Sequence, residues 1–204
     1  MFQKNILFLL MMFCALASLT MIFYRNPSAP TITGMATSSG NVTLTVNSTS
    51  AIQFAVNSVN WGTGSVNASD VTHNYTCTLD TEGTTTGCIN FTAVTQPLII
   101  ENNGNTNLSV SIYSNASATD FIGSGSTFQW KVLQNESGSC TTTPSPATYS
   151  PVNVSVSNAT IICSNLGYTD SNDSLKLNLK VTIPLAVMSG PAGDRSATIT
   201  VVGN

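Results

Sequence analysis

Charge is scarce in this chain. Only 7% of its 204 residues are Asp, Glu, Lys or Arg, against ~25% in a typical soluble domain. The six basic residues are scattered along the chain and the acidic residues form no run. The protein therefore has no row of basic residues that could bind the phosphate backbone of a nucleic acid. We expect no nucleic-acid partner. Hydroxyl and amide side chains must solvate most of the surface instead.

Histidine is almost absent as well, and this limits the chemistry available. The single histidine, His73, lies in a polar run, and no C-x-x-C pair is present. Asp80 and Glu82 are the closest candidate for a pair of catalytic carboxylates, but they lie in a Gly- and Thr-rich turn. Nucleophilic and acid–base catalysis need a positioned base. We interpret this turn as a solvated hairpin tip and predict no enzyme, no catalytic residue, no metal ligand and no cofactor.

Two further polar motifs are weak signals. Asp170, Asn172 and Asp173 carry oxygen atoms of the kind that bind calcium. However, this run lacks the glycine and glutamate positions of an EF-hand loop, so an ordinary Asx turn is favoured. A covalent Lys–Asn cross-link needs a buried lysine, whereas Lys176 and Lys180 fall on the polar phase of their predicted strand.

The N-terminus has the pattern of an export segment. Lys4 precedes an uncharged apolar run, Ile6–Tyr24, which ends at Arg25. Ala15 and Ala17 form an A-x-A pattern typical of a cleavage site, yet the run is also long enough to span a membrane as a helix. A cleaved signal and a retained anchor both remain open. Either one places the rest of the chain outside the cell.

The domain organisation follows from this segment. Residues 1–25 form the signal peptide or membrane anchor, and residues 26–30 form a short Pro/Ser linker. Residues 31–204 then form one β-sandwich ectodomain of ordinary size. The localisation expected is the extracellular face of the envelope, secreted or anchored by one N-terminal helix.

Four cysteines follow the export segment, and an even number in an exported chain indicates disulfides. Three pairings are possible among Cys77, Cys88, Cys140 and Cys163. We favour Cys77 with Cys88 and Cys140 with Cys163, because each pair brackets a loop rich in Thr, Ser, Gly or Pro.

Acceptor sequons for N-glycosylation, N-x-S/T, are frequent. They occur at Asn41, Asn47, Asn67, Asn74, Asn90, Asn107, Asn115, Asn135, Asn153, Asn158 and Asn172. From Asn41 to Asn47 the sequon asparagines alternate with Val42, Leu44 and Val46. Alternate side chains of a strand face opposite sides. The pattern predicts apolar residues toward a core and glycans toward solvent, and it recurs around Asn107 and Asn153.

The rest of the chain alternates with period two and shows no helical periodicity. The predicted strands are 31–36, 41–48, 51–57, 88–95, 97–102, 106–113, 127–134, 152–156, 158–163, 175–183 and 195–202. Many short strands separated by turn residues predict an all-β fold. We expect a single antiparallel β-sandwich of about 8–11 strands, of Ig-like or jelly-roll type, preceded by one N-terminal hydrophobic helix.

Three segments carry a resemblance to a group of exported proteins. They are Asn60-Trp-Gly-Thr63, Ile99-Ile-Glu-Asn-Asn-Gly-Asn105 and Ala192-Gly-Asp-Arg-Ser-Ala-Thr-Ile-Thr-Val201. Together they resemble the glycosylated β-sandwich envelope proteins of archaea and, more distantly, TasA/camelysin-type fibre proteins and WxL-type surface domains. The resemblance implies a sandwich with a structural or adhesive role and assembly by strand donation. The repeated Trp-x-Leu motif of wall-binding domains is missing.

Two functions follow as expectations. The first is a non-enzymatic structural or adhesive surface protein, an envelope component or filament subunit, in which Thr31–Val46 would be the donated strand. The alternative is a carbohydrate- or partner-binding module, which predicts that Trp61, Tyr113 and Tyr168 are exposed on one face. Trp130 shares the apolar phase of its strand and is expected in the core. The partners are then the membrane, if the N-terminal segment is uncleaved, and further copies of the chain.

Overall fold

The computed structural model describes residues 44–45, 47–189 and 193–204. The chain divides into two compact units, Met1–Thr45 and Val46–Asn204. Of the first unit only Leu44 and Thr45 are described, and they have no regular structure. The expected N-terminal helix, the linker and the first predicted strand therefore lie outside the described residues. None of the helices in the described ranges has both the length and the apolar character needed to cross a membrane.

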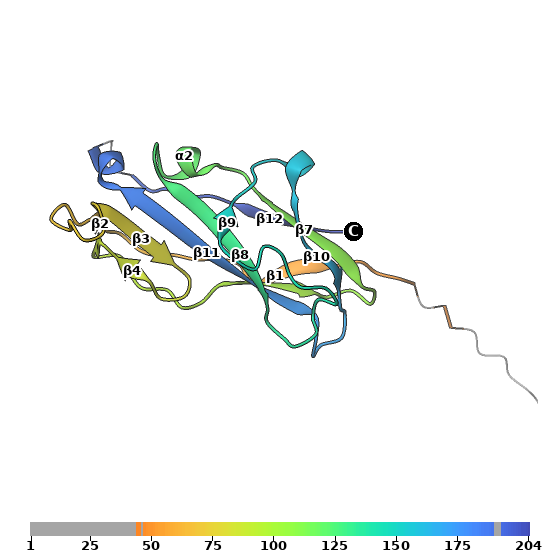
Figure 1. Ribbon diagram of the computed structural model, residues 1–204. Coiled ribbons are helices and arrows are strands. Elements are labelled where there is room, and N and C mark those ends of the chain that lie inside the picture. The colour runs from red at the N-terminus through yellow and green to blue at the C-terminus, as the bar shows by residue number, and fades with distance from the viewer. Residues whose placement is uncertain (1–43, 46, 190–192) are drawn as a thin grey trace, which may run out of the picture. The chain divides into compact units, whose positions relative to one another are not determined.

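The second unit is an all-β structure (Figure 1). Its strands are β1 (Ile52–Val56), β2 (Ser65–Val66), β3 (Thr76–Asp80), β4 (Thr85–Thr86), β5 (Cys88–Ile89), β6 (Leu98–Asn102), β7 (Leu108–Ser114), β8 (Thr127–Gln134), β9 (Ser150–Pro151), β10 (Thr160–Leu166), β11 (Ser174–Pro184) and β12 (Ile199–Gly203). The helical pieces are short: α2 (Ala118–Phe121) and the 3₁₀ turns η1 (Val156–Asn158) and η2 (Leu185–Ser189).

The larger sheet is built around β11, its longest strand. On one side β11 pairs with β8 over Leu175–Thr182. On the other side its first half pairs with β6 and its second half with β3. β1 extends the sheet beyond β6, β4 beyond β3, and β9 beyond β8. Every described pair is antiparallel, as the sequence predicts.

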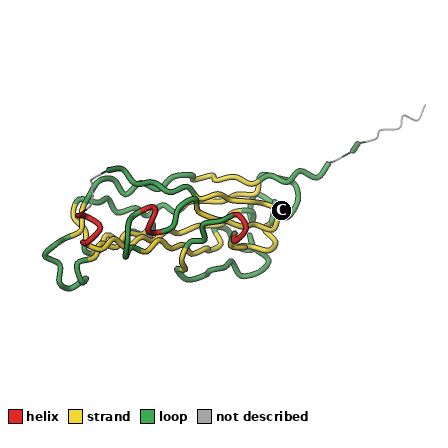
Figure 2. The backbone as a smooth tube through the Cα atoms, turned by 90° about the horizontal axis from the view of Figure 1, so that it is seen from above, coloured by secondary structure: helices red, strands yellow, loops and turns green. Residues whose placement is uncertain are grey.

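The smaller sheet, in the order β10–β7–β12, faces the larger one and closes the core. Trp130 of β8 and Ile112 of β7 are both 0% exposed and belong to the same buried cluster. Figure 2 shows the strands running lengthwise, with the connecting loops gathered at their ends. A third pair, β2 and β5, lies beside the end of the larger sheet. The period-two alternation is the cause of this arrangement, because each strand presents one apolar face to the opposite sheet.

Two predicted strands are wrong over most of their length. Residues 90–97 have no regular structure, because Asn90 adopts a positive φ of 63° that ends β5 after two residues. In the predicted strand 152–156, Ser155 caps the 3₁₀ turn η1 and Val156 is 67% exposed. Of the apolar face predicted beside Asn153, only Val152 packs against the core, whereas Val154 and Val156 are exposed.

The prediction of strand 41–48 is also wrong for its described part. Residues 44, 45 and 47–50 are exposed and have no strand partner. Leu44, which should face a core, is 83% exposed. The alternation is present in the sequence, but the described chain offers it no neighbouring strand. Conversely, β3 was not predicted, because only Cys77 and Leu79 of its five residues are apolar.

Both disulfides form with the favoured pairing. Cys77 bonds to Cys88 with a Cα–Cα distance of 4.7 Å, and Cys140 bonds to Cys163 at 5.9 Å. The first links β3 to β5, and the second links the loop after β8 to β10. Each bridge thereby fixes an irregular segment against the core.

Candidate functional site

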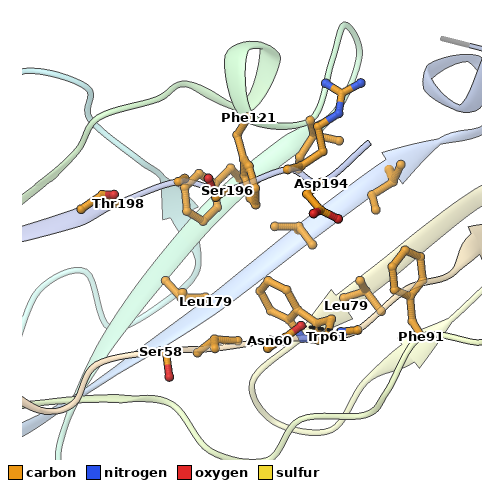
Figure 3. A pocket seen from close by; sticks show the side chains of 18 of the residues that line it. Ser58, Asn60, Trp61, Leu79, Phe91, Phe121, Leu179, Asp194, Ser196 and Thr198 are labelled. Atoms are coloured by element: carbon orange, nitrogen blue, oxygen red, sulfur yellow. Dashed lines mark hydrogen bonds between the residues drawn. The ribbon is translucent and has the colours of Figure 1, made fainter. Parts of the chain in front are cut away.

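A groove of about 940 Å³ opens between two segments that border the larger sheet. Its floor is the inner face of that sheet, including Leu79 of β3 and Leu179 of β11, at the end where the smaller sheet no longer covers it. One wall is residues 57–64, which continue from β1. The other is residues 193–199, which lead into β12. Figure 3 shows the two walls facing each other across these leucines.

Both walls leave backbone groups unpaired. No backbone hydrogen bond among the described residues involves residues 57–60 or residues 194–197. Each wall adjoins a strand but has no regular structure itself, so its N–H and C=O groups are available to a further strand. Unpaired edges of this kind readily accept another strand. The groove thus combines two free edges with an apolar floor, which is the arrangement that an inserted strand would fill.

Trp61 belongs to the groove wall. It is half-buried, and its Nε1 donates a hydrogen bond of 3.2 Å to the carbonyl oxygen of Asp80. Phe91 and Phe121 line the groove nearby. Trp61 packs against the edge of the core, and Trp130 is fully buried as predicted.

The aromatic residues predicted for a binding face do not gather together. Trp61 follows the C-terminal end of β1, whereas Tyr168 precedes the N-terminal end of β11. The register places the N-terminal ends of β1 and β11 at the same end of the sheet, through β6. Trp61 and Tyr168 therefore lie at opposite ends of the sandwich, and Tyr113 lies half-buried in the smaller sheet.

Asp80 and Glu82 occupy different environments, which corrects their interpretation as a solvated tip. Asp80 is only 6% exposed, and its Oδ1 accepts hydrogen bonds from the N–H groups of Glu82 and Thr84, both at 2.9 Å. Desolvation raises the pKa of Asp80, but these bonds and the nearby Lys180 outweigh it and hold the pKa below its usual value. Asp80 thus stays ionised and organises the turn.

Glu82 lies on the outer face of the larger sheet and is fully engaged there. Its two carboxylate oxygens accept hydrogen bonds from Lys131 Nζ at 2.8 and 2.7 Å, and one accepts from Tyr149 Oη at 3.0 Å. Burial first, and then Glu82, raise the pKa of Tyr149. The ammonium groups of Lys131 and Lys180 lie 4.7 and 5.4 Å from the centre of the Tyr149 ring. These contacts of Tyr149 hold the loop before β9 against the larger sheet.

His73 pairs with a neighbouring acid. Its Nδ1 lies 2.7 Å from Asp70 Oδ2. The hydrogen bond from His73 is the main reason that the pKa of Asp70 is lowered. Cys77, the nearest cysteine in sequence, is held in its disulfide.

The sequon asparagines lie at the surface wherever they are described. Asn41 falls outside the described residues, and Asn67 and Asn172 are half-buried. The exposed ones are Asn47, Asn74, Asn90, Asn107, Asn115, Asn135, Asn153 and Asn158. Burial of the asparagine therefore does not prevent glycan attachment at any described sequon.

Comparison with known protein families, curated proteins and solved structures finds no match to this chain.

Sequence reasoning missed the groove as a site. Its walls come from residues 57–64 and 193–199, which are separated by most of the chain. The available signal is the composition of these two segments, which are rich in polar and small residues and lie between apolar strands. Such residues are poor at forming a paired edge strand.

Proposed function

We propose that this chain is a non-enzymatic structural or adhesive protein of the outer cell surface, exported and N-glycosylated, whose copies assemble by β-strand donation. The observation that carries the proposal is the groove with two unpaired edges over an apolar floor. The donor is residues 31–46 of a neighbouring copy, which alternate apolar and polar residues in their second half.

The exposure of Leu44 supports this donor. A leucine that is 83% exposed gains about 1.5–3 kcal/mol when it is fully buried, and Val42 and Val46 share its phase. The edges of residues 57–60 and 194–197 would add backbone hydrogen bonds to these side-chain contacts. A strand in the groove would therefore satisfy both the donor and the acceptor.

A filament is favoured by the place where the donor segment joins the sandwich and by the place of the groove. The chain enters the sandwich beside the β6–β7 turn, where Thr49 N–H donates to Asn105 Oδ1 at 2.7 Å and Asn105 Nδ2 donates to the Asn47 carbonyl at 2.9 Å. The groove lies toward the opposite end, near the start of β12. A head-to-tail contact that does not close on itself generates an open chain of subunits.

The first test compares two variants of the same donor segment. Leu44→Asp places a charge on the apolar phase, and Thr45→Asp places it on the polar phase without altering a sequon. We expect wild type and Thr45→Asp to form filaments in negative-stain electron microscopy, and Leu44→Asp to remain monomeric by analytical ultracentrifugation with an unchanged circular dichroism spectrum. Filaments of Leu44→Asp, or wild type that stays monomeric, would contradict the proposal.

The alternative is a carbohydrate-binding module, favoured by the half-buried Trp61 in the groove wall. In that case polysaccharides would quench the tryptophan fluorescence of Leu44→Asp, whose groove stays open. The same samples therefore distinguish the two functions.

The finer fold type is also a proposal. From β6 to β8 and from β10 to β12, consecutive strands alternate between the two sheets. This alternation supports a jelly-roll type over an Ig-like type.

A further inference from the structure

Three loops meet at the end of the sandwich opposite the groove. Asn102, at the end of β6, is 1% exposed, and its Nδ2 donates to the carbonyl oxygens of Gly167 at 2.7 Å and Thr106 at 2.9 Å. The N–H of Asp173 donates to Glu136 Oε2 at 3.0 Å, and its carbonyl accepts from Asn102 N–H at 3.1 Å. The β6–β7, β8–β9 and β10–β11 connections are thus fixed together.

A cavity of about 310 Å³ that is open to solvent lies at this meeting point. Glu101, Asp170 and Asp173 line it, and no lysine, arginine or histidine does. The ion pairs among the described residues, His73–Asp70 and Lys131–Glu82, involve none of these acids. The cavity therefore gathers negative charge that the described chain does not compensate.

An unpartnered oxygen is buried in this cavity wall. Asp173 is 5% exposed, and its Oδ1 has no hydrogen-bond partner. The adjacent Asn172 also has a buried Oδ1 without a partner. Leaving a buried acceptor unpaired costs ~1–3 kcal/mol, and more for a charged one. Such groups call for an explanation, and a bound ion is one.

The electrostatics agree with this geometry. Glu101 and Asp170 line the same cavity as Asp173, and the Glu136 carboxylate accepts a hydrogen bond from the Asp173 N–H. Repulsion among four carboxylates is relieved when a cation neutralises them.

We propose that this loop cluster binds a divalent cation of the calcium type, with the side-chain oxygens of Asp173 and Asn172 as ligands. Within the described ranges no three acidic, histidine or cysteine side chains are already arranged to hold a metal. The remaining ligands are therefore backbone carbonyls, water and a movement of Glu101 or Asp170 toward the ion. Calcium suits this set, because it accepts six to eight oxygen ligands in flexible geometry, whereas Mg²⁺ requires a near-ideal octahedron.

Glycosylation and cation binding at this loop are compatible. A glycan on Asn172 would be attached through Nδ2, which leaves Oδ1 free to bind the ion. The expected affinity is that of extracellular calcium modules, a dissociation constant of ~10⁻⁴–10⁻³ M. The site does not depend on the proposed function, since it lies at the other end of the sandwich from the groove.

The test is calcium binding by the full chain after treatment with EGTA and dialysis. We expect isothermal titration calorimetry with CaCl₂ to show one site per chain, and CaCl₂ to raise the melting temperature above that in NaCl of equal ionic strength. Asp173→Asn should weaken the affinity at least tenfold. Asp194→Ala removes an exposed carboxylate at the groove end without creating a sequon and should leave both readouts unchanged.

Asp173→Asn is expected to fold, because it replaces a buried carboxylate with a neutral group of the same shape. Asp170→Asn provides a second, exposed position and should weaken the affinity severalfold. Absence of binding at 10 mM CaCl₂ would overturn the proposal, as would equal responses of Asp173→Asn and Asp194→Ala. Equal affinity for Mg²⁺ would overturn the assignment to calcium.

Discussion

At the scale of single residues, the charge of Asp173 controls how stability depends on pH. The folded chain holds the proton of this carboxyl up to about pH 6, whereas an ordinary aspartate releases it near 3.8. Folding therefore takes up a proton between these values, and the free energy of unfolding rises as the pH falls through about 6. Above that pH the ionised Asp173 destabilises the calcium-free chain.

Asp173→Asn is accordingly expected to stabilise the calcium-free chain at pH 7.5 by about 1–3 kcal/mol. The gain over wild type should shrink as the pH is lowered toward 4, where wild-type Asp173 is protonated. Urea unfolding in EGTA at several pH values measures this difference. A gain that is independent of pH would mean that the charge of Asp173 is not its source.

At the scale of elements, Thr81 ties the turn after β3 to the central strand. Thr81 is 1% exposed, its Oγ1 accepts from Leu179 N–H at 3.0 Å, and the same hydroxyl donates to Asn178 Oδ1 at 3.3 Å. β11 pairs with β3 only over its second half, so this hydroxyl continues the connection where the ladder ends.

We expect Thr81→Val to lower the free energy of unfolding by about 1–3 kcal/mol, because two buried polar groups lose their partner. Thr81→Ser keeps the hydroxyl and should cost less. Chemical denaturation of both variants checks the order. Equal losses would assign the effect to packing of the methyl group instead of to the hydrogen bonds.

At the scale of the whole molecule, we propose that glycans compensate for the shortage of charge. With 7% charged residues, the surface depends on other groups for solubility. Eight described sequon asparagines are exposed, whereas Asn67 and Asn172 are half-buried. The exposed acceptors all lie outside the strands, in the segments that precede or connect them, so their glycans would extend from the loops of the sandwich.

We expect peptide mass spectrometry of the native protein to find higher glycan occupancy at the exposed sequons than at Asn67 and Asn172. Enzymatic or chemical removal of the glycans should lower the concentration at which the protein precipitates. Unmodified peptides at all of these sites would remove glycosylation from the proposed function.

The strands that were predicted well are those whose alternation is long and uninterrupted. Residues 127–134 coincide with β8, and 175–183 lie within β11. The equally long segment 88–95 is predicted wrongly, because one backbone angle ends its strand. The positive φ of Asn90 ends β5, whereas β3 is fixed by its pairing with β11, by its two buried side chains and by its disulfide.

The amino-acid sequence alone determined the all-β class and the favoured disulfide pairing, since alternation and loop composition are local properties. It also placed the sequons, whose surface exposure the fold then established. Only the tertiary structure decided the two candidate sites. The groove needs residues 57–64 to face 193–199, and the cation site needs Glu101, Glu136 and Asp173 to meet. Distances between remote segments depend on how the sheets pack, and no local pattern records them.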